Sequence, residues 1–323
     1  DALALHALFM ILVVAIVAGG VEDGIEKATK LMVPSIVVIL AVLGVWVFTL
    51  PGAGPGYTYF LSPDLSQLSL SVSFDPLPSF SGPLTDIIPF AVSQAFFSLS
   101  LGMGAMITYA SYIDEDESLP ADGGLVVGLN TTIGVLAGLV VIPLLFVQFG
   151  TVPENAASGG AGALFVSVAQ AFTDLGMAGR AFGALFFFVV LIAALSSAIS
   201  LLEVVTSYCV DRYDWNRKAT AFGFGGALFL LGTLAAWDTA WLTWFDNLAY
   251  SVLLPASVLL GVVFVGWVYG PEAVDEIRQG SSADASVARV WIWWMRTVVF
   301  VGVLVTLYLG VTSIYASPGL PFL

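Results

Sequence analysis

The stretch FFSLSLGMGAMITYASY, residues 96–112, is a hydrophobic segment that interrupts its own helix. Ser98, Ser100, Gly102 and Gly104 follow two phenylalanines in the middle of an apolar run. Glycine costs about 1 kcal/mol relative to alanine inside a helix, and an unwound turn leaves backbone carbonyls without helical partners. In hydrocarbon such a turn is tolerated only where it is covered by protein or lines a cavity. The stretch therefore predicts a broken membrane helix that holds a sodium ion and a substrate.

The composition of the whole chain is that of an integral membrane protein. Hydrophobic residues make up 59% of it and charged residues only 10%, whereas soluble domains contain about 25% charged residues. Most of its apolar runs exceed the roughly 20 residues that cross a bilayer as a helix. We predict an all-α integral membrane protein with about eight transmembrane helices, at residues 2–19, 31–50, 86–110, 125–150, 181–208, 219–236, 241–269 and 291–314.

Several function classes are excluded by the residues present. The single cysteine, Cys209, and the single histidine, His6, exclude a disulfide framework and a Cys/His metal cluster. The sequence has no HExxH or GxSxG motif and no paired intramembrane aspartates. A membrane enzyme is therefore not expected.

The basic residues predict the orientation of the chain in the membrane. Eight of the nine fall in three loops that share one side when eight spans are counted, and only Arg180 falls on the other side. The positive-inside rule makes the shared side cytoplasmic, so segments 51–85 and 149–178 are expected to be external. The eight residues are Lys27, Lys30, Arg212, Arg217, Lys218, Arg278, Arg289 and Arg296.

The formal net charge of −14 supports a second expectation. An acidic, lysine-poor surface suits a high-salt interior, in which the Debye length falls to a few ångströms. We therefore expect a halophilic source, and the alternative is a set of ordinary acidic loops.

Three segments resemble a known family. The stretch QAFFSLSLGMGAMITYASY (94–112) closely resembles the sixth helix of the neurotransmitter:sodium symporters, the LeuT-type transporters. Gly24 and Pro34, separated by nine residues, resemble the family's fifth helix, and ALSSAISLLEVV (194–205) resembles its eighth. The resemblance covers nearly the whole chain, as helices four to eleven.

The resemblance implies a LeuT-type inverted-repeat bundle. Residues 1–323 are then one transporter domain, with the end of the first repeat at 1–50, the second repeat at about 86–270 and an extra helix at 291–314. The first three helices of the family are expected to be missing, because the chain begins at Asp1 inside an apolar run. Such a fragment is not expected to transport by itself.

The resemblance also implies two sodium sites. Ser98 and Asn130 match the first site, and Ala193, Ser196 and Ser197 match the second through a carbonyl and two hydroxyls. Sodium prefers hard oxygen ligands of these kinds. Two alternatives stay open: Asn130 could make an interhelical hydrogen bond instead, and the two serines could bond back to their own helix.

The family's substrate pocket maps onto an apolar surface with a few hydroxyls and no charge of its own. This surface predicts a neutral substrate, preferably a hydrophobic or aromatic amino acid. Phe97 resembles the aromatic lid of the pocket, and its alternative role is core packing. The predicted pocket residues are Phe97, Ser98, Ser100, Met103, Ser197 and Leu201.

Three residues are candidates for gating or ion movement. Glu203 is an ionisable residue in a membrane helix, which is a functional candidate by default; it relays an ion or proton, or it is a paired carboxylate within the bundle. Asp211 matches the family's cytoplasmic gate, and Tyr112 matches the tyrosine that supports this gate. Asp211 could otherwise be a solvated charge at a helix end.

Two positions depart from the family pattern. The external gate aspartate falls at Ala249, so either Asp246, about one turn earlier, substitutes for it or the gate is built differently. Chloride-independent members carry an acid where this chain has Gly134, whereas Gln94 and Ser98, which would help to bind chloride, are present. Chloride dependence therefore stays open.

The sequence as a whole predicts sodium-coupled symport of a neutral amino acid by alternating access in the plasma membrane. Its expected partners are sodium, the amino-acid substrate and the lipid bilayer, with no nucleic acid; a homodimer is left open. The competing hypothesis is a sodium-dependent amino-acid sensor or channel on the same fold, which would bind substrate or pass current without stoichiometric uptake.

Overall fold

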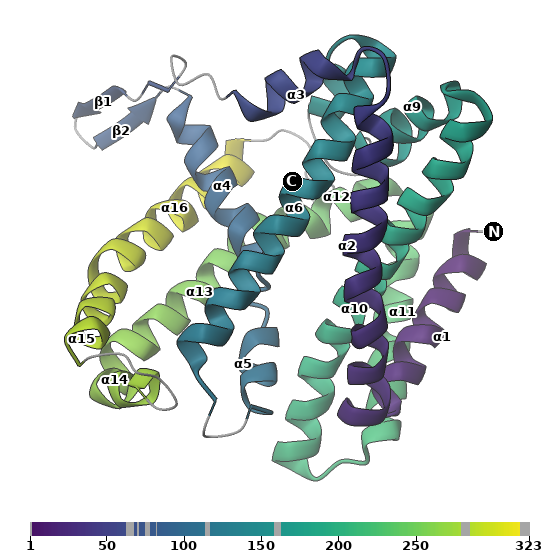
Figure 1. The fold of residues 1–323 in the computed structure, drawn as a ribbon. Coiled ribbons are helices and arrows are strands. Elements are labelled where there is room, and N and C mark those ends of the chain that lie inside the picture. The colour runs from purple at the N-terminus through teal and green to yellow at the C-terminus, as the bar shows by residue number, and fades with distance from the viewer. Residues whose placement is uncertain are drawn as a thin grey trace. The chain divides into compact units, whose positions relative to one another are not determined.

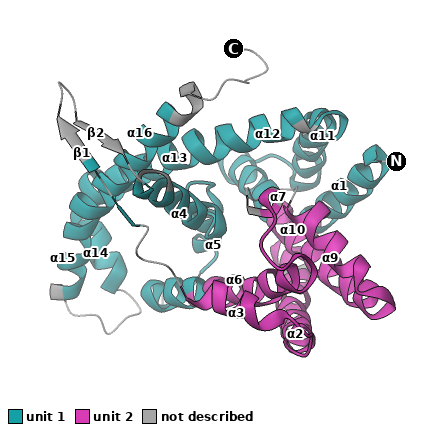
Figure 2. Cartoon of the chain, turned by 90° about the horizontal axis from the view of Figure 1, so that it is seen from above, with its two compact units in different colours: residues 1–18, 66–127, 200–323 teal, residues 19–65, 128–199 magenta. Residues whose placement is uncertain are grey.

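A computed structural model of the chain describes residues 2–62, 68–69, 71–74, 78–81, 83–113, 117–157, 163–278 and 285–316. The chain folds into two compact units, which are coloured separately in Figure 2. Unit 1 contains residues 1–18, 66–127 and 200–323, and unit 2 contains residues 19–65 and 128–199. Two long helices, α6 (Leu119–Phe149) and α10 (Gly176–Tyr213), contribute residues to both units.

Unit 1 begins with α1 (Ala2–Ala18), which packs beside α11 (Arg217–Trp237) (Figure 1). Val13, Val14 and Val17 form the buried face of α1. Gly225 of α11 allows the close approach, because a Cβ there would overlap Cγ2 of Val14. Small residues at interhelical contacts are typical of membrane helices, in which van der Waals packing drives association.

Unit 1 also contains a helix that is broken in two. The first half is α4 (Leu84–Ser98) and the second half is α5 (Ala105–Ala110) (Figure 1). The C-terminal helices are α12 (Thr239–Leu248), α13 (Leu254–Val263), α14 (Gly270–Arg278), α15 (Ala285–Trp294) and α16 (Phe300–Ala316). They are linked by the π-helical turns η4 (Ala249–Leu253), η5 (Phe264–Tyr269) and η6 (Met295–Val299).

Unit 2 has an apolar core built from three long helical segments. Buried Leu43 and Val47 of α2 (Lys27–Phe48) meet Val140 and Leu144 of α6 in one cluster with Phe186 of α10. Trp46 adds a stacked contact with Phe182, with 4.2 Å between ring centroids. The other elements of this unit are η1 (Val21–Glu26), α3 (Ala53–Leu61), α7 (Glu154–Ala157), η3 (Ala163–Val168) and α9 (Ala169–Asp174).

The predicted spans all appear as apolar helices. Six helices of the described residues are long and apolar enough to cross a membrane. The two other predicted runs, 2–19 and 86–110, contain the shorter apolar helices Ala2–Ala18 and Ile87–Ser98. The chain is therefore a multi-pass membrane protein, as predicted, and the interruption after residue 98 is the reason why one span is short. The six long helices are Gly24–Phe48, Leu119–Phe149, Gly176–Tyr213, Arg217–Trp237, Ala240–Arg278 and Val287–Thr312.

The segment 51–85 contains more structure than a simple loop. Beside α3 it forms an antiparallel hairpin of β1 (Ser71–Phe74) and β2 (Pro78–Ser81), in which Ser71 pairs with Ser81. This small hairpin is the one addition, among the described residues, to the predicted all-α class. The helix α3 packs closely against α6, where a Cβ on Gly56 would lie 2.5 Å from the Cα of Pro143.

Candidate functional site

The broken helix lies where the sequence predicts it. The helix α4 ends at Ser98 and α5 begins at Ala105. Three alternate residues of the intervening segment have left-handed backbone conformations, with φ of 55° at Ser100, 79° at Gly102 and 82° at Gly104. A residue other than glycine rarely adopts such a φ, so Ser100 marks backbone strain, which clusters at functional sites.

The break is packed closely against two other helices of unit 1. A Cβ on Gly102 would lie 3.0 Å from the carbonyl oxygen of Leu254 and 3.0 Å from Cγ2 of Val258, both on α13. A Cβ on Gly104 would lie 2.9 Å from Cγ1 of Val204 on α10. At both positions glycine is favoured for two reasons: it adopts a positive φ without strain, and it has no Cβ that would collide with the neighbouring helix.

Most of the predicted pocket residues belong to unit 1. Phe97 and Ser98 end α4 with exposed side chains, and Ser100 and Met103 are half-buried within the break. Leu201 is exposed on the part of α10 that belongs to this unit. Four of the six predicted pocket residues thus lie in the contiguous stretch 97–103, and Leu201 lies on α10 in the same unit.

The predicted residues of the second sodium site lie together on α10, in unit 2. Ser196 donates its hydroxyl hydrogen to the carbonyl oxygen of Ala193 at 2.9 Å. The sequence left open that this serine bonds back to its own helix, and the structure shows such a bond. Its acceptor, the Ala193 carbonyl, is also a predicted sodium ligand. Within α10 this carbonyl also accepts the backbone N–H four residues further on, so the bond from Ser196 occupies its second lone pair. Ser197 is exposed beside them, and Asn130 is half-buried on α6 of the same unit.

Two tyrosines join the second half of the broken helix to α10. Tyr109 of α5 donates to Oγ of Ser200 at 2.7 Å, and Tyr112, two residues beyond α5, donates to Oε1 of Glu203 at 2.8 Å. The two donors, Tyr109 and Tyr112, are three residues apart, and so are their acceptors, Ser200 and Glu203. This spacing places the two acceptors on one face of α10. The broken helix is therefore held to α10 at two successive points.

Glu203 is completely buried and paired with a positive charge. Its carboxylate forms an ion pair with Arg217, the first residue of α11. The guanidinium of Arg217 also donates to the carbonyl oxygen of Val17, at the end of α1, at 3.0 Å. Of the two roles left open for Glu203, the paired carboxylate is the one observed. Removing one partner of such a buried pair leaves a costly uncompensated charge.

The contact with Glu203 also determines the chemistry of Tyr112. Burial raises the pKa of the Tyr112 hydroxyl, and the hydrogen bond to the Glu203 carboxylate raises it further. Both effects disfavour ionisation of the phenol, which is consistent with its role as the donor to Glu203. Tyr112 contacts Glu203, and its predicted support of the cytoplasmic gate at Asp211 stays a prediction.

The other predicted gate and ion residues have exposed side chains. Asp211 lies near the end of α10, and Asp246 lies on α12, three residues before Ala249. Gln94, a predicted chloride-binding residue, is exposed on α4. Gly134, which stands where chloride-independent members carry an acid, is exposed on α6. These four positions keep the roles predicted from the sequence as untested predictions.

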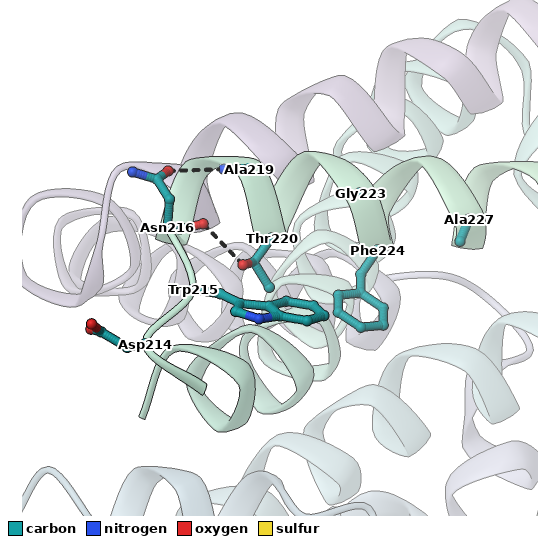
Figure 3. Close-up of a pocket in the computed structure, with 8 residues that line it drawn as sticks. All are labelled: Asp214, Trp215, Asn216, Ala219, Thr220, Gly223, Phe224 and Ala227. Carbon is teal, nitrogen blue, oxygen red and sulfur yellow. Dashed lines mark hydrogen bonds between the residues drawn. The ribbon is translucent and has the colours of Figure 1, made fainter. Parts of the chain in front are cut away.

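A cavity of about 590 Å³ opens at the turn between α10 and α11 (Figure 3). Trp215 lies beside Phe224 along one side of it. Asn216 closes its end, where Oδ1 accepts from the amide of Ala219 at 3.1 Å and caps α11. None of its lining residues is a predicted site residue. They are Asp214, Trp215, Asn216, Ala219, Thr220, Gly223, Phe224 and Ala227.

Three contact residues were not predicted from the sequence. Tyr109, Arg217 and Tyr250 make side-chain hydrogen bonds to distant parts of unit 1. Tyr109 could have been identified from its position three residues before the predicted gate residue Tyr112, because this spacing lets both side chains face the same neighbouring helix. Arg217 was assigned only to a cytoplasmic loop, because the sequence contains no sign that a loop arginine reaches back to a buried carboxylate.

Known proteins with similar sequences are sodium-dependent transporters. An uncharacterized sodium-dependent transporter of Methanocaldococcus jannaschii is 30% identical over 88% of this chain and 55% of its own length. Another, from Bacillus subtilis, is 30% identical over 94% of this chain and 65% of its own length. A sodium-dependent nutrient amino acid transporter of Drosophila mojavensis is 25% identical over 89% of this chain and 44% of its own length.

A solved structure has the same fold. It is the crystal structure of MhsT in complex with L-phenylalanine, which is 34% identical, covers 95% of this chain and 68% of the MhsT chain, and superposes with a TM-score of 0.79. The chain thus spans between about half and two thirds of the length of these relatives. The profile of the Sodium:neurotransmitter symporter family matches residues 3–319, and we conclude that the chain belongs to this family of sodium-dependent transporters.

Proposed function

We propose that this chain serves in sodium-coupled symport of a neutral, hydrophobic or aromatic amino acid by alternating access. The observation that carries the proposal is the break between α4 and α5, in which Ser100, Gly102 and Gly104 have positive φ inside an apolar span. An unwound turn of this kind supplies backbone carbonyls at membrane depth, which the discontinuous helices of secondary transporters use to bind ions and substrate.

The proposed sodium ligands are oxygen atoms of serine, asparagine and the backbone. We assign the first site to Ser98 and Asn130 and the second to Ala193, Ser196 and Ser197. Sodium is a hard cation, and hydroxyl, amide and carbonyl oxygens satisfy it. The two oxygens of Ser196 and Ala193 lie 2.9 Å apart in a hydrogen bond, and a sodium ion at the second site would compete with this bond for both oxygens.

The proposed substrate follows from the residue types of the predicted pocket. Phe97, Met103 and Leu201 are apolar, and Ser98, Ser100 and Ser197 add hydroxyls without charge. An unbranched thioether such as that of Met103 adapts to side chains of several shapes. Two relatives agree with a substrate of this class: MhsT was crystallised with L-phenylalanine, and the Drosophila relatives are named as nutrient amino acid transporters.

Tyr112, Asp211 and Glu203 are proposed to act on the cytoplasmic side. Tyr112 links the second half of the broken helix to the Glu203–Arg217 pair, so movement of this half requires the hydrogen bond to break. Sodium that orders the break raises substrate affinity by the same factor by which substrate raises sodium affinity. On the other side, Asp246 is proposed to contribute to the external gate.

The decisive experiment is sodium-dependent binding of a panel of radiolabelled neutral amino acids to the purified full-length protein that contains this chain. Asn130→Ala and Ser197→Ala are expected to lower affinity at fixed sodium by about tenfold or more, since each removes a proposed ligand. Ser35→Ala is the matched control, because this exposed hydroxyl only donates to the carbonyl of Leu31 in its own helix. Binding that is indifferent to sodium, or to both site variants, would contradict the proposal.

The sensor or channel hypothesis is separated from symport by uptake into proteoliposomes. A symporter accumulates labelled amino acid in a fixed ratio to sodium entry, whereas a sensor binds without accumulation and a channel passes uncoupled current. Replacement of chloride by gluconate in the same assay tests the proposed contribution of Gln94 and Ser98. Uptake that is unchanged without chloride excludes chloride coupling.

A further inference from the structure

The first half of the broken helix is held by a contact that no predicted site residue makes. Tyr250, in the π-helical turn η4, donates its hydroxyl hydrogen to the carbonyl oxygen of Phe90 in α4 at 2.8 Å. The two aromatic rings also pack together, with centroids 6.0 Å apart and planes at 52°. One side chain therefore contacts both the backbone and the side chain of the same α4 residue.

The π-helical turn brings this tyrosine next to a position where the chain departs from its family. The turn begins at Ala249, where the family resemblance placed a gate aspartate, and Ala249 has only a methyl group to offer. Asp246 lies four residues before Tyr250, so the two share a face of the helix. Single π-helical turns inside α-helices occur frequently at functional sites, and here the turn carries a hydroxyl donor immediately after the apolar position.

The turn that carries Tyr250 is itself closely packed. A Cβ on Gly310 of α16 would overlap the carbonyl oxygen of Ser251, so the two backbones meet directly next to Tyr250. One turn further on, Leu254 contacts Gly102 in the break. The backbone that carries the Tyr250 donor is thus packed against α16 on one side, and one turn further on it packs against the break at Gly102.

The acceptor is a backbone atom. A helical carbonyl oxygen has two lone pairs, so the Phe90 carbonyl can accept from Tyr250 and keep its bond within α4. Because the acceptor is a backbone atom, the hydrogen bond can form whatever residue occupies position 90, whereas it requires a donor at position 250. A hydroxyl that is lost from position 250 cannot be replaced by a neighbour such as Ala249.

We propose that Tyr250 is a positioning residue for alternating access, and that its hydroxyl tethers α4 to the η4 turn and favours closure of the predicted external side. This inference rests on the proposed function for its purpose, but the tether can be tested without it. Interhelical hydrogen bonds in membranes average about 0.6 kcal/mol, and about 1.4 kcal/mol corresponds to a tenfold change in an equilibrium. Loss of the hydroxyl is therefore expected to shift the ratio of open to closed protein about threefold.

The test measures the distance between α4 and α12 with a pair of spin labels. Ile88→Cys and Leu242→Cys place the labels on exposed positions of the two helices, and the buried Cys209 is replaced by alanine. Electron–electron double resonance is recorded for the intact protein in nanodiscs, with Tyr250 and with Tyr250→Phe. We expect the population at longer distance to rise about threefold relative to the shorter one in Y250F, with the midpoint of thermal unfolding nearly unchanged.

Two control variants separate the tether from general packing. Tyr308→Phe removes the hydroxyl of another tyrosine of unit 1, which is 59% exposed on α16, and it is expected to leave both populations unchanged. Phe90→Leu removes the ring contact but keeps the carbonyl acceptor, and its shift is expected to be smaller than that of Y250F. Equal distributions in the Tyr250 and Y250F proteins, or the same shift in Y308F, would overturn the proposal.

Sodium-dependent binding is measured on the same labelled samples. A threefold shift together with sodium-dependent binding supports the tether and its role in transport. A shift without any sodium-dependent binding keeps the tether and contradicts the proposed function. Binding without a shift contradicts the tether alone.

Discussion

The two halves of the broken helix are anchored in different ways. Both use tyrosine hydroxyls, but α5 and the residues after it are tied to α10 through Tyr109 and Tyr112, and one acceptor is a buried, ion-paired carboxylate. The first half, α4, is tied through Tyr250 to a neutral backbone carbonyl. Hydrogen bonds to charged groups are worth roughly twice as much as neutral ones. The difference indicates that α4 is released at lower cost than α5.

Removal of Arg217, whose charge pairs with the Glu203 carboxylate that Tyr112 contacts, is expected to cause the largest loss of stability. Arg217→Ala leaves the Glu203 carboxylate buried without its counterion, and breaking such a pair costs about 3–5 kcal/mol. We expect a large fall in the midpoint of thermal unfolding in detergent. Adding Glu203→Gln to R217A should recover part of this loss, because it removes the unpaired charge.

Lys218→Ala is the matched control for that experiment. Lys218 is the exposed neighbour of Arg217 on α11, so K218A should change stability by no more than about 0.5 kcal/mol. A comparable loss in K218A, or no recovery in the R217A/E203Q double variant, would show that the pair does not anchor α5.

A substitution between the two halves should affect both anchors. Gly104→Ala introduces a Cβ at a φ of 82° and 2.9 Å from Val204, and backbone strain of this kind costs about 1–3 kcal/mol. We expect G104A to lower both the unfolding midpoint and sodium-dependent substrate binding. Gly128→Ala is its control, since a Cβ there meets nothing within 4 Å and alanine favours a helix. Equal behaviour of the two variants would refute the packing argument.

The smallest losses of stability are expected for the two tyrosines that anchor the α5 half directly. Tyr112→Phe removes a hydrogen bond to a carboxylate and should cost about 1 kcal/mol, less than a buried charged bond because the Tyr112 side chain is 40% exposed. Tyr109→Phe removes a neutral bond to Ser200 and should cost about 0.6 kcal/mol. Chemical denaturation of the single and double variants measures both values, and a larger cost for Y109F than for Y112F would reverse the proposed ranking.

Much of the architecture follows from local sequence. The eight apolar runs and the interruption between Ser98 and Ala105 were predicted closely, because hydropathy and glycine placement act through the chain's own neighbours. The back-bonding of Ser196 to Ala193 was among the alternatives that the helix register allowed. These features depend on residues only a few positions apart.

The partners of polar side chains could not be predicted in the same way. The sequence left Glu203 between a relay and a paired carboxylate, and only the fold brings Arg217 and Tyr112 to it. The sequence also left open which residue takes the place of the gate aspartate that the family has at the position of Ala249. In the structure the next residue, Tyr250, lies in the π-helical turn η4 and donates to the backbone of α4. A π-helical turn has no strong sequence signature, because it depends on packing such as that of Gly310 against Ser251.

The sequence by itself determined that this chain crosses a membrane several times, where its helix breaks, and to which family it is similar. Those properties arise from hydrophobicity and from the backbone freedom of glycine, which each residue carries with it. Tertiary structure alone decided which side chains hold the two halves of the break. In a low-dielectric interior a buried charge or donor requires a partner, and that partner can lie anywhere along the chain, as Tyr112 lies 91 residues from the buried Glu203.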